Sequence, residues 1–339
     1  MGNLKFAVMG CGFWSKFQIA AWKELEGVEL VALYNRTKAK AEKLAEEFDV
    51  PSVYDDAEEM LEKESLDFVD IITDVDTHAP FTELASRYVK NVICQKPMGP
   101  DLATAENMVK TTKDRDVNFY VHENFRWQSP LRQFKEILQS GEIGKVFKSR
   151  VTFCSGFPVF DNQPFLAELD QFILTDIGSH ILDVCRFLFG EPIDLHCKIK
   201  TVNPKIKGED VANVFMEMED GSHCYAEMSY ASILEKESFP QTLVLAEGSE
   251  GSIKLEHDFK IKITTRNGTR EITAAPEMYD WADPDYALIH SSIVDCNRDI
   301  LQDLQDKKES ETTGDDNIKT IRLVYQCYDS AAKDEKLKF

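Results

Sequence analysis

The sequence has 339 residues, of which 43% are hydrophobic and 29% are charged. A chain of this length normally divides into two domains, each large enough to bury its own core. Acidic residues outnumber basic ones by 60 to 39, and the formal charge of -21 repels nucleic acid and anionic lipid at long range. No segment has the run of about 18 apolar residues that a membrane helix needs. We therefore expect neither a nucleic-acid partner nor a membrane partner.

The cysteines and the first residues bear on the compartment. The eight cysteines are scattered, with no CxxC pair and no Cys/His cluster at zinc-ligand spacing, as is usual for reduced thiols in the cytosol. We expect packing cysteines and no metal site. The opening MGNLKFAVMGCGFW has too little positive charge and too short an apolar run for a signal peptide. The expected location is the cytoplasm.

Short β-branched runs alternate with amphipathic helical stretches in the first third of the chain. The strand candidates are LKFAVMG, VELVALYN, DFVDIIT, NVICQKP and NFYVHENF. This alternation predicts a doubly wound parallel sheet of the Rossmann type, and apolar cores such as FVDII fit strands that are buried on both faces.

The pattern of apolar and polar residues changes after a helix expected at 130–140. Longer alternating strands follow, such as VFKSRVTFCS and VANVFMEMEDGSHCYAEMSYAS, which predict a large open, mostly antiparallel sheet. Asp220-Gly221 and Asn267-Gly268 have the composition of hairpin turns. Helical periodicity returns at 286–306 and 316–334. We therefore predict an α/β fold with a Rossmann domain at 1–124, a second α/β domain at 125–315, and a C-terminal helix at 316–339 that packs back on the Rossmann domain.

A glycine-rich segment, Gly10-Cys11-Gly12-Phe13-Trp14-Ser15, closes the first strand and opens a helix. Such a turn lets the backbone approach the pyrophosphate of a dinucleotide at a helix N-terminus. Ser15 replaces the third glycine of the usual pattern, but it is small enough for close helix packing. The segment predicts a nicotinamide dinucleotide site.

The end of the second strand bears on the choice of dinucleotide. A site that prefers NAD usually carries Asp or Glu about 20 residues beyond the glycines. Asn35 stands there, 23 residues after Gly12, and Arg36 and Thr37 follow it. Without the carboxylate a 2′-phosphate is not repelled, and Arg36 and Thr37 can bind one. The pattern favours NADP slightly over NAD; the alternative is an arginine stacked on adenine in a site that takes either.

Two segments carry side chains suited to proton transfer. Gln95-Lys96-Pro97 places a lysine at the carboxyl end of a buried strand, where doubly wound sheets bind their ligands. In DIGSHILD (176–183), helical spacing would put Asp176, His180 and Asp183 on one face. A histidine beside carboxylates is a plausible general base near neutral pH. Taken alone, each segment also has a structural interpretation, as a solvated lysine and a hydrogen-bonded core histidine.

With these motifs in place, the chain resembles the Gfo/Idh/MocA family of oxidoreductases, which includes glucose–fructose oxidoreductase and inositol dehydrogenase. The carriers are GCGFWS at 10–15, QKP at 95–97, DIGSHILD at 176–183 and the late Gly314-Asp315-Asp316-Asn317. The resemblance runs through nearly the whole chain. It implies a Rossmann domain, and a second domain whose open sheet makes a homo-oligomer, a dimer or a tetramer.

The resemblance also implies site residues. The catalytic residues are Lys96, Asp176 and His180. The expected cofactor contacts, for NAD or NADP, are Gly10, Gly12, Phe13, Trp14, Asn35, Arg36, Thr37, Thr73, His78, Gln95 and Lys96. The expected substrate contacts are Lys96, His122, Asn124, Arg126, Trp127, Asp176 and His180. The polar segment 122–128 begins at the end of the strand candidate NFYVHENF, and a hinge packed by an aromatic ring is its alternative interpretation.

Three departures from the family pattern stand out. Gln95 replaces the usual Glu, so it keeps hydrogen bonding but lacks the charge. Thr73-Asp74 replaces the usual Thr-Pro, although His78 remains in its loop. The acid is missing at Asn35. QKP together with HENFRWQ resembles a branch whose members include sugar dehydrogenases such as D-apiose dehydrogenase.

The expected activity is hydride transfer between nicotinamide C4 and a secondary alcohol or hemiacetal carbon of a sugar, inositol or related polyol. Two alternatives belong to other classes. One is an NAD-dependent glycosidase that acts by transient oxidation, and the other is a non-catalytic sensor of dinucleotide or sugar. The presence of Lys96, Asp176 and His180 speaks against a pure binder, which needs no proton-transfer set.

Overall fold

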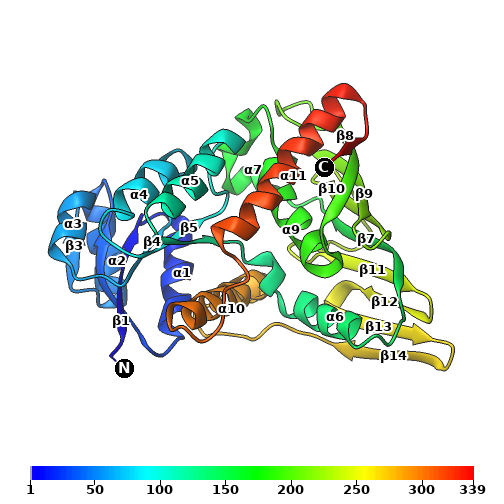
Figure 1. Cartoon of the computed structure of the whole chain (residues 1–339), viewed down its shortest axis with the longest axis horizontal. Helices are drawn as coiled ribbons and strands as arrows, with labels where there is room; N and C mark the ends of the chain where they lie inside the picture. Colours follow the sequence, from blue (N-terminus) through cyan, green and yellow to red (C-terminus); the bar gives the residue numbers. More distant parts are fainter. Residues whose placement is uncertain (1) are drawn as a thin grey trace. The chain divides into compact units, whose positions relative to one another are not determined.

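The computed structural model describes residues 2–339 (Figure 1). The chain folds into two compact units. Unit 1 holds the chain up to Asn124 together with Tyr279–Pro284 and His290–Ile321, and unit 2 holds Phe125–Met278, Asp285–Ile289 and Arg322–Phe339. None of the described helices is long and apolar enough to cross a membrane.

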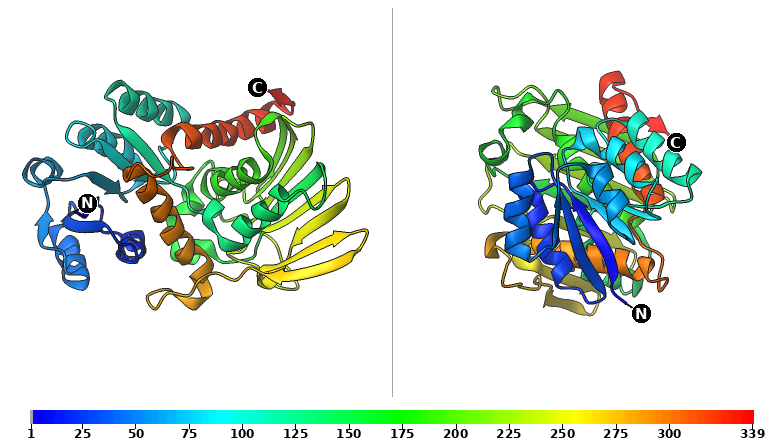
Figure 2. Two further views of the ribbon diagram at one scale, coloured as in Figure 1. Left: turned by 60° about the horizontal axis from the view of Figure 1, so that its bottom comes forward. Right: turned by 90° about the vertical axis from the view of Figure 1, so that its left-hand side faces the viewer.

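Unit 1 is built on a six-stranded parallel sheet, seen as blue and cyan strands in the right-hand view of Figure 2. The strands are β1 (Leu4–Met9), β2 (Val28–Tyr34), β3 (Ser52–Tyr54), β4 (Phe68–Ile71), β5 (Asn91–Gln95) and β6 (Asn118–His122). The helices between them are α1 (Phe13–Lys23), α2 (Lys38–Phe48), α3 (Ala57–Lys63), η1 (Val75–Thr77), α4 (His78–Ala85) and α5 (Leu102–Asp114). The strand order β3-β2-β1-β4-β5-β6 is that of the Rossmann fold, as predicted.

The strands of unit 1 are buried on both faces, which explains their continuous apolar runs. In β4, Phe68, Val69 and Ile71 expose no surface. Phe68 stacks on Phe6 of β1 with ring centroids 4.7 Å apart, and Trp22 of α1 packs against both rings. Asp70, also fully buried, is the one acidic residue within this strand.

Unit 2 is built on a nine-stranded sheet of order β14-β13-β12-β11-β7-β10-β9-β8-β15. Of the strand pairs that the structure describes in this sheet, only β7–β10 is parallel. The strands, drawn in green and yellow in Figure 2 except for the red β15, are β7 (Val146–Cys154), β8 (Pro192–Lys200), β9 (Val211–Met218), β10 (His223–Ser229), β11 (Leu243–Gly248), β12 (Gly251–Leu255), β13 (Lys260–Thr265), β14 (Gly268–Thr273) and β15 (Leu337–Lys338). The predicted open, mostly antiparallel sheet is confirmed. Hairpins join β9 to β10 and β13 to β14 as predicted, but Gly268 is the first residue of β14, so the second turn lies at Arg266-Asn267 and not at Asn267-Gly268.

One face of this sheet packs against helices. The helical segments of unit 2 are η2 (Phe125–Trp127), α6 (Ser129–Gln139), α7 (Val159–Asn162), η3 (Pro164–Glu168), α8 (Ile173–Asp176), α9 (Gly178–Phe189) and η4 (His257–Phe259). Alternate residues of the strands, such as Val214, Met216 and Ala226, join Ile181 and Cys185 of α9 in one buried core.

The last part of the chain runs through η5 (Pro284–Tyr286), α10 (Ala287–Leu304) and α11 (Gly314–Lys333). Residues 290–321 belong to unit 1. The reason is local pairing: Val121 of β6 donates its N–H to the carbonyl of Thr312 at 2.9 Å, and Ile293 of α10 packs with Ala21 of α1. The expected domain boundaries themselves, and the docking of the final helix, stay predictions.

Candidate active site

The glycine-rich turn closes β1 and opens α1. Gly10 has φ +107°, and a Cβ at this position would lie 2.5 Å from the carbonyl oxygen of Ile72. Gly12 is different: its φ of -86° suits any residue, and a Cβ there would meet nothing within 4 Å. Since neither the backbone nor the packing demands glycine at position 12, the space in front of it fits the close approach of a ligand.

Ser15, in place of the third glycine, holds the turn together. Its hydroxyl accepts from the N–H of Gly12 at 3.1 Å and donates to the carbonyl of Gly10 at 2.8 Å. Phe13, the first residue of α1, is 83% exposed. Trp14 is partly buried and packs against the cluster around Ala21, and its expected contact with the cofactor stays a prediction. The helix N-terminus and the turn can hold a pyrophosphate, and these residues fit a dinucleotide.

The end of β2 is tied to the same turn. Asn35 accepts from the N–H of Cys11 at 3.0 Å and donates to the carbonyl of Thr37 at 2.9 Å. Its amide therefore shapes both the glycine-rich turn and the segment that follows. The next two side chains, Arg36 and Thr37, are exposed. Both can therefore be reached by a 2′-phosphate or an adenine ring.

The loops after β4 and β5 are joined by a buried histidine. His78 is 1% exposed, and its two ring nitrogens lie 2.9 Å from the carbonyl of Pro97 and 3.0 Å from that of Thr73. Burial lowers the pKa of His78, against the effect of the two carbonyls. His78 thus connects the two loops, and this structural role is sufficient to explain its presence. A direct contact between His78 and the cofactor stays a prediction.

Lys96 follows β5 directly and is half-buried. Gln95 before it is 9% exposed; its amide oxygen accepts from the backbone N–H of Lys96, and its amide nitrogen donates to Gln18 of α1, both at 2.8 Å. The carboxyl ends of parallel strands meet at one edge of the sheet, so Lys96 and the glycine-rich turn belong to the same edge.

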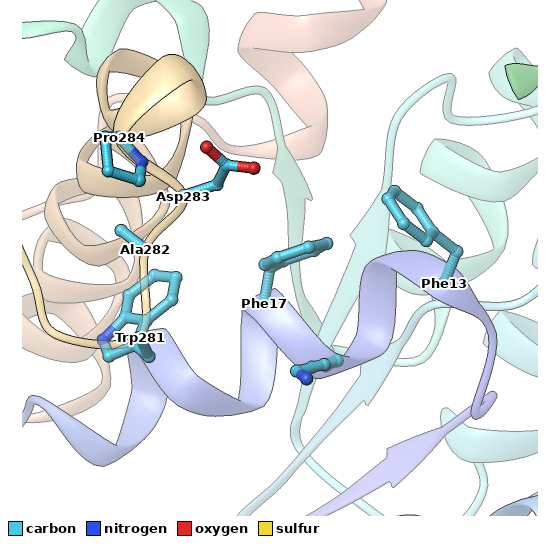
Figure 3. Close-up of a pocket in the computed structure, with 7 residues that line it drawn as sticks. Phe13, Phe17, Trp281, Ala282, Asp283 and Pro284 are labelled. Atoms are coloured by element: carbon cyan, nitrogen blue, oxygen red, sulfur yellow. The ribbon is translucent and has the colours of Figure 1, made fainter.

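Beside the turn lies a cavity of about 560 Å³ with aromatic walls. Figure 3 shows the rings of Phe13 and Phe17 on the face of α1 that is turned toward Trp281 and Asp283. Phe17 stacks on His290 with centroids 4.4 Å apart. Lys16, Ala282 and Pro284 complete the lining. A flat ring of a ligand could pack against the aromatic side chains here. The sequence did not predict that residues 281–284 line this cavity, because no local signal relates them to α1 some 260 residues earlier.

In unit 2 the DIGSHILD segment spans the last residue of α8 and the first half of α9, and Ile177 lies between the two helices. Asp176 ends α8, half-buried, and Tyr230 donates to its Oδ2 at 3.4 Å. His180 of α9 is 4% exposed and stacks on Phe125 with ring centroids 3.9 Å apart. Burial and then the Asp176 charge raise the pKa of Tyr230, which stays a protonated donor.

The third residue of the predicted face, Asp183, has a structural role. Its buried carboxylate accepts a hydrogen bond from Nε of Arg126 at 2.7 Å and another from Nη2 of the same guanidinium. Arg126, which we expected at the substrate, is 5% exposed.

The remaining residues of the 122–127 segment are also buried. His122 lies 3.0 Å from Asn297, Asn124 donates to Ser292 at 2.8 Å, and Arg132 stacks over Trp127 at 4.2 Å. Burial lowers the pKa of His122 to about 4, so this imidazole is neutral. These contacts favour the structural interpretation of the segment, and its expected contact with substrate stays a prediction.

Sequence reasoning missed Glu209, which is 4% exposed. Its carboxylate accepts from the N–H groups of Phe172 and Leu174 at 3.3 and 3.2 Å and from the hydroxyl of Tyr328 at 2.7 Å. It therefore caps the first turn of α8, the helix that ends at Asp176. A single glutamate in a loop carries no recognisable signal.

All eight cysteines lie within residues 2–339 and are free, and all but the half-buried Cys154 are buried. No group of three or more His, Cys, Asp or Glu side chains within those residues is arranged to hold a metal ion.

Comparison with known proteins places the chain in a family. Residues 4–123 match the oxidoreductase family with NAD-binding Rossmann fold, GFO/IDH/MocA, and residues 131–254 match the GFO/IDH/MocA C-terminal domain. A D-apiose dehydrogenase of Rhizobium rhizogenes is 39% identical over 98% of this chain and 96% of its own length. The chain belongs to the GFO/IDH/MocA family of oxidoreductases.

Two further relatives support this membership. A D-apiose dehydrogenase of Paraburkholderia graminis is 41% identical over 97% of this chain and 88% of its own. The crystal structure of an Agrobacterium radiobacter oxidoreductase in complex with NAD+, L-tartaric acid and magnesium has a TM-score of 0.96 and 38% identity, covering 99% of this chain and 98% of that one. This GFO/IDH/MocA oxidoreductase therefore has an N-terminal domain that binds NAD(P), and the resemblance stated from its motifs is confirmed.

Proposed function

We propose that this GFO/IDH/MocA oxidoreductase is an NAD(P)-dependent dehydrogenase of a sugar or polyol, with D-apiose as the first candidate substrate. The observation that carries the proposal is the edge of the parallel sheet in unit 1. There the turn with the open space at Gly12 and the half-buried Lys96 follow strands of one sheet. Two relatives of about 40% identity are D-apiose dehydrogenases, which supports the substrate class.

The proposed chemistry assigns a role to each catalytic residue. The dinucleotide, when bound, supplies C4 of its nicotinamide as the hydride acceptor or donor. The Lys96 ammonium donates a hydrogen bond to the oxygen of the reacting CH–OH group and stabilises negative charge on it. His180 accepts the hydroxyl proton as the C–H hydride leaves, and Asp176, held by Tyr230, orients the substrate. In the reductive direction His180 returns the proton.

We propose a modest preference for NADP over NAD, resting on Asn35, Arg36 and Thr37. Arg36 and Thr37 are exposed, and Asn35 carries no charge. Asp55 and Asp56 contribute, after burial, to raising the pKa of Tyr34, so negative charge lies close to the end of β2. Arg36 opposes it. This balance is why we expect a preference and not an exclusive choice.

We further propose that the protein forms a homo-oligomer in the cytoplasm through the outer face of the nine-stranded sheet. Residues that alternate with the core positions face outward there. Among them Tyr225 is 43% exposed and packs with Phe215 at 4.9 Å. Light scattering should give a dimer or tetramer mass, and Tyr225→Asp should shift it toward the monomer.

The test of the activity is absorbance of reduced nicotinamide with NAD or NADP and a panel that contains D-apiose, other aldoses, inositols and sugar lactones. Substrate-dependent reduction that Lys96→Ala abolishes, with dinucleotide binding retained, is the expected result. Full turnover by Lys96→Ala would refute the catalytic assignment. Release of nitrophenol from a glycoside without net dinucleotide reduction would instead show a glycosidase.

A further inference from the structure

A chain of hydrogen bonds between buried side chains in unit 1 ends at the backbone of Lys96. Asp70, in the middle of β4, accepts from Nε1 of Trp22 at 2.8 Å and from Nε2 of Gln18 at 2.8 and 3.0 Å. Oε1 of Gln18 accepts from Nε2 of Gln95 at 2.8 Å, and Oε1 of Gln95 accepts from the N–H of Lys96 at 2.8 Å. Asp70 and Gln18 expose no surface.

The direction of donation along this chain of hydrogen bonds is set by the carboxylate of Asp70. An ionised carboxylate accepts and never donates, so Gln18 must turn its NH2 group toward Asp70. The oxygen of Gln18 then faces Gln95, whose NH2 group must donate to it. The oxygen of Gln95 is thereby left for the N–H of Lys96. Turning either amide alone would bring two donors or two acceptors face to face without water to separate them.

Ionisation of Asp70 is compatible with this role near neutral pH. Burial raises the pKa of this carboxyl to about 6, while the hydrogen bonds from Trp22 and Gln18 oppose the rise. A charge inside a strand whose other members are Phe68, Val69 and Ile71 is costly. Hydrophobic packing alone would favour an apolar residue there.

We propose that Asp70 is a positioning residue for Lys96: it orients the amides of Gln18 and Gln95 so that Gln95 fixes the backbone from which the lysine side chain extends. The consequence for turnover rests on the proposed function, which makes Lys96 catalytic. The geometric part does not depend on that function.

Reversing the chain tests the proposal. In Asp70→Asn the new NH2 group would face Gln18 and favour a turned Gln18 amide. Gln95 would then face two donors, the NH2 group of Gln18 and the N–H of Lys96, with only one amide oxygen to accept from them. In Gln95→Glu two carboxylates would compete for the one NH2 group of Gln18. In the double variant the chain can run in the opposite direction, from the amide introduced at position 70 through Gln18 to the carboxylate introduced at position 95. The N–H of Lys96 then keeps its acceptor.

The expected result is that each single variant lowers kcat about tenfold, the scale of one lost buried hydrogen bond, while the double variant recovers most of it. KM for the dinucleotide should change little in Asp70→Asn, because Asp70 and Gln18 are not among the expected cofactor contacts. Trp22→Phe is the matched control: it removes one hydrogen bond to Asp70 without changing the direction of Gln18, so it should lower the melting temperature and leave kcat unchanged.

Hydrogen exchange of a peptide spanning residues 91–98 separates this proposal from the proposed function. Faster exchange in both single variants and slow exchange in the double variant would support the positioning role, whatever the substrate. Unchanged exchange and kcat in the single variants, or a double variant no better than the poorer single one, would overturn it. If Asp70→Asn does not fold, the comparison of Gln95→Glu with the double variant still decides. Full turnover by Lys96→Ala would refute only the catalytic assignment of Lys96 and would leave the geometric part of this proposal standing.

Discussion

Arg126 and Asp183 form a buried ion pair, with Nε of the arginine 2.7 Å from Oδ2 of the aspartate. The pair joins η2 to α9, the helix that carries His180. Arg186 adds a second guanidinium 3.8 Å from the same carboxylate. The last aspartate of DIGSHILD therefore holds α9 in place.

Asp183→Asn should destabilise unit 2 strongly, because it removes the negative charge that faces the buried guanidinium of Arg126. The expected loss in the free energy of unfolding is about 3 kcal/mol. Denaturant unfolding measures it, with Asp114→Asn as the control. Asp114 pairs with Lys110 on an exposed helix surface, so its loss should cost below about 0.5 kcal/mol. Equal effects of the two substitutions would contradict the structural role of Asp183.

Glu209→Gln should weaken the first turn of α8 and displace Asp176. The amide replaces an anionic acceptor of two backbone N–H groups, and about 1–2 kcal/mol of stability should be lost. We expect kcat to fall with it. Tyr328→Phe removes only the hydroxyl donor to Glu209 and should affect kcat less. The two variants are compared by thermal unfolding and by steady-state kinetics, and a larger fall in kcat for Tyr328→Phe would argue against the cap.

The dinucleotide preference should respond to the end of β2. Arg36→Ala should raise KM for NADP and leave KM for NAD nearly unchanged, since the guanidinium is the positive charge available to a 2′-phosphate. Asn35→Asp should shift the ratio of kcat/KM further toward NAD, because a carboxylate there repels the phosphate. Lys40→Ala, on the exposed side of α2, is the control and should change neither value. Parallel changes with both dinucleotides would contradict a 2′-phosphate contact.

Asp70 predicts a pH dependence of stability. Its pKa is raised from 3.8 to about 6 in the folded protein, so between these values the folded state binds more protons than the unfolded state. The contribution of Asp70 to the free energy of unfolding should therefore fall by about 3 kcal/mol as pH rises from about 4 to 6, and stay constant above.

The difference between wild type and Asp70→Asn, measured by urea unfolding across this range, isolates that contribution. The groups that face Asp70 are the neutral Trp22 and Gln18 and the thiol of Cys94, whose pKa burial raises far above the range. A difference that rises with pH, or does not change, would show that the carboxylate is not desolvated.

Local patterns in the sequence were sufficient for the architecture. The period of two in β9 and β10, the apolar runs of the parallel strands and the glycine-rich turn each report on residues that are close together in the chain. They predicted both sheets, both hairpins, and the family. The same signals named Lys96, Asp176 and His180 as candidates, because strand ends and helix faces follow from local periodicity.

Only the tertiary structure decided the partners of the buried polar groups. The sequence does not relate Asp70 to Gln18 across 52 residues, Glu209 to α8 across more than 30, or Arg126 to Asp183 across 57. Nor does it show that Thr312 lies beside β6. Periodicity indicates which face of a helix or strand is buried. The partner of a buried donor or acceptor depends instead on which distant segments the fold brings together.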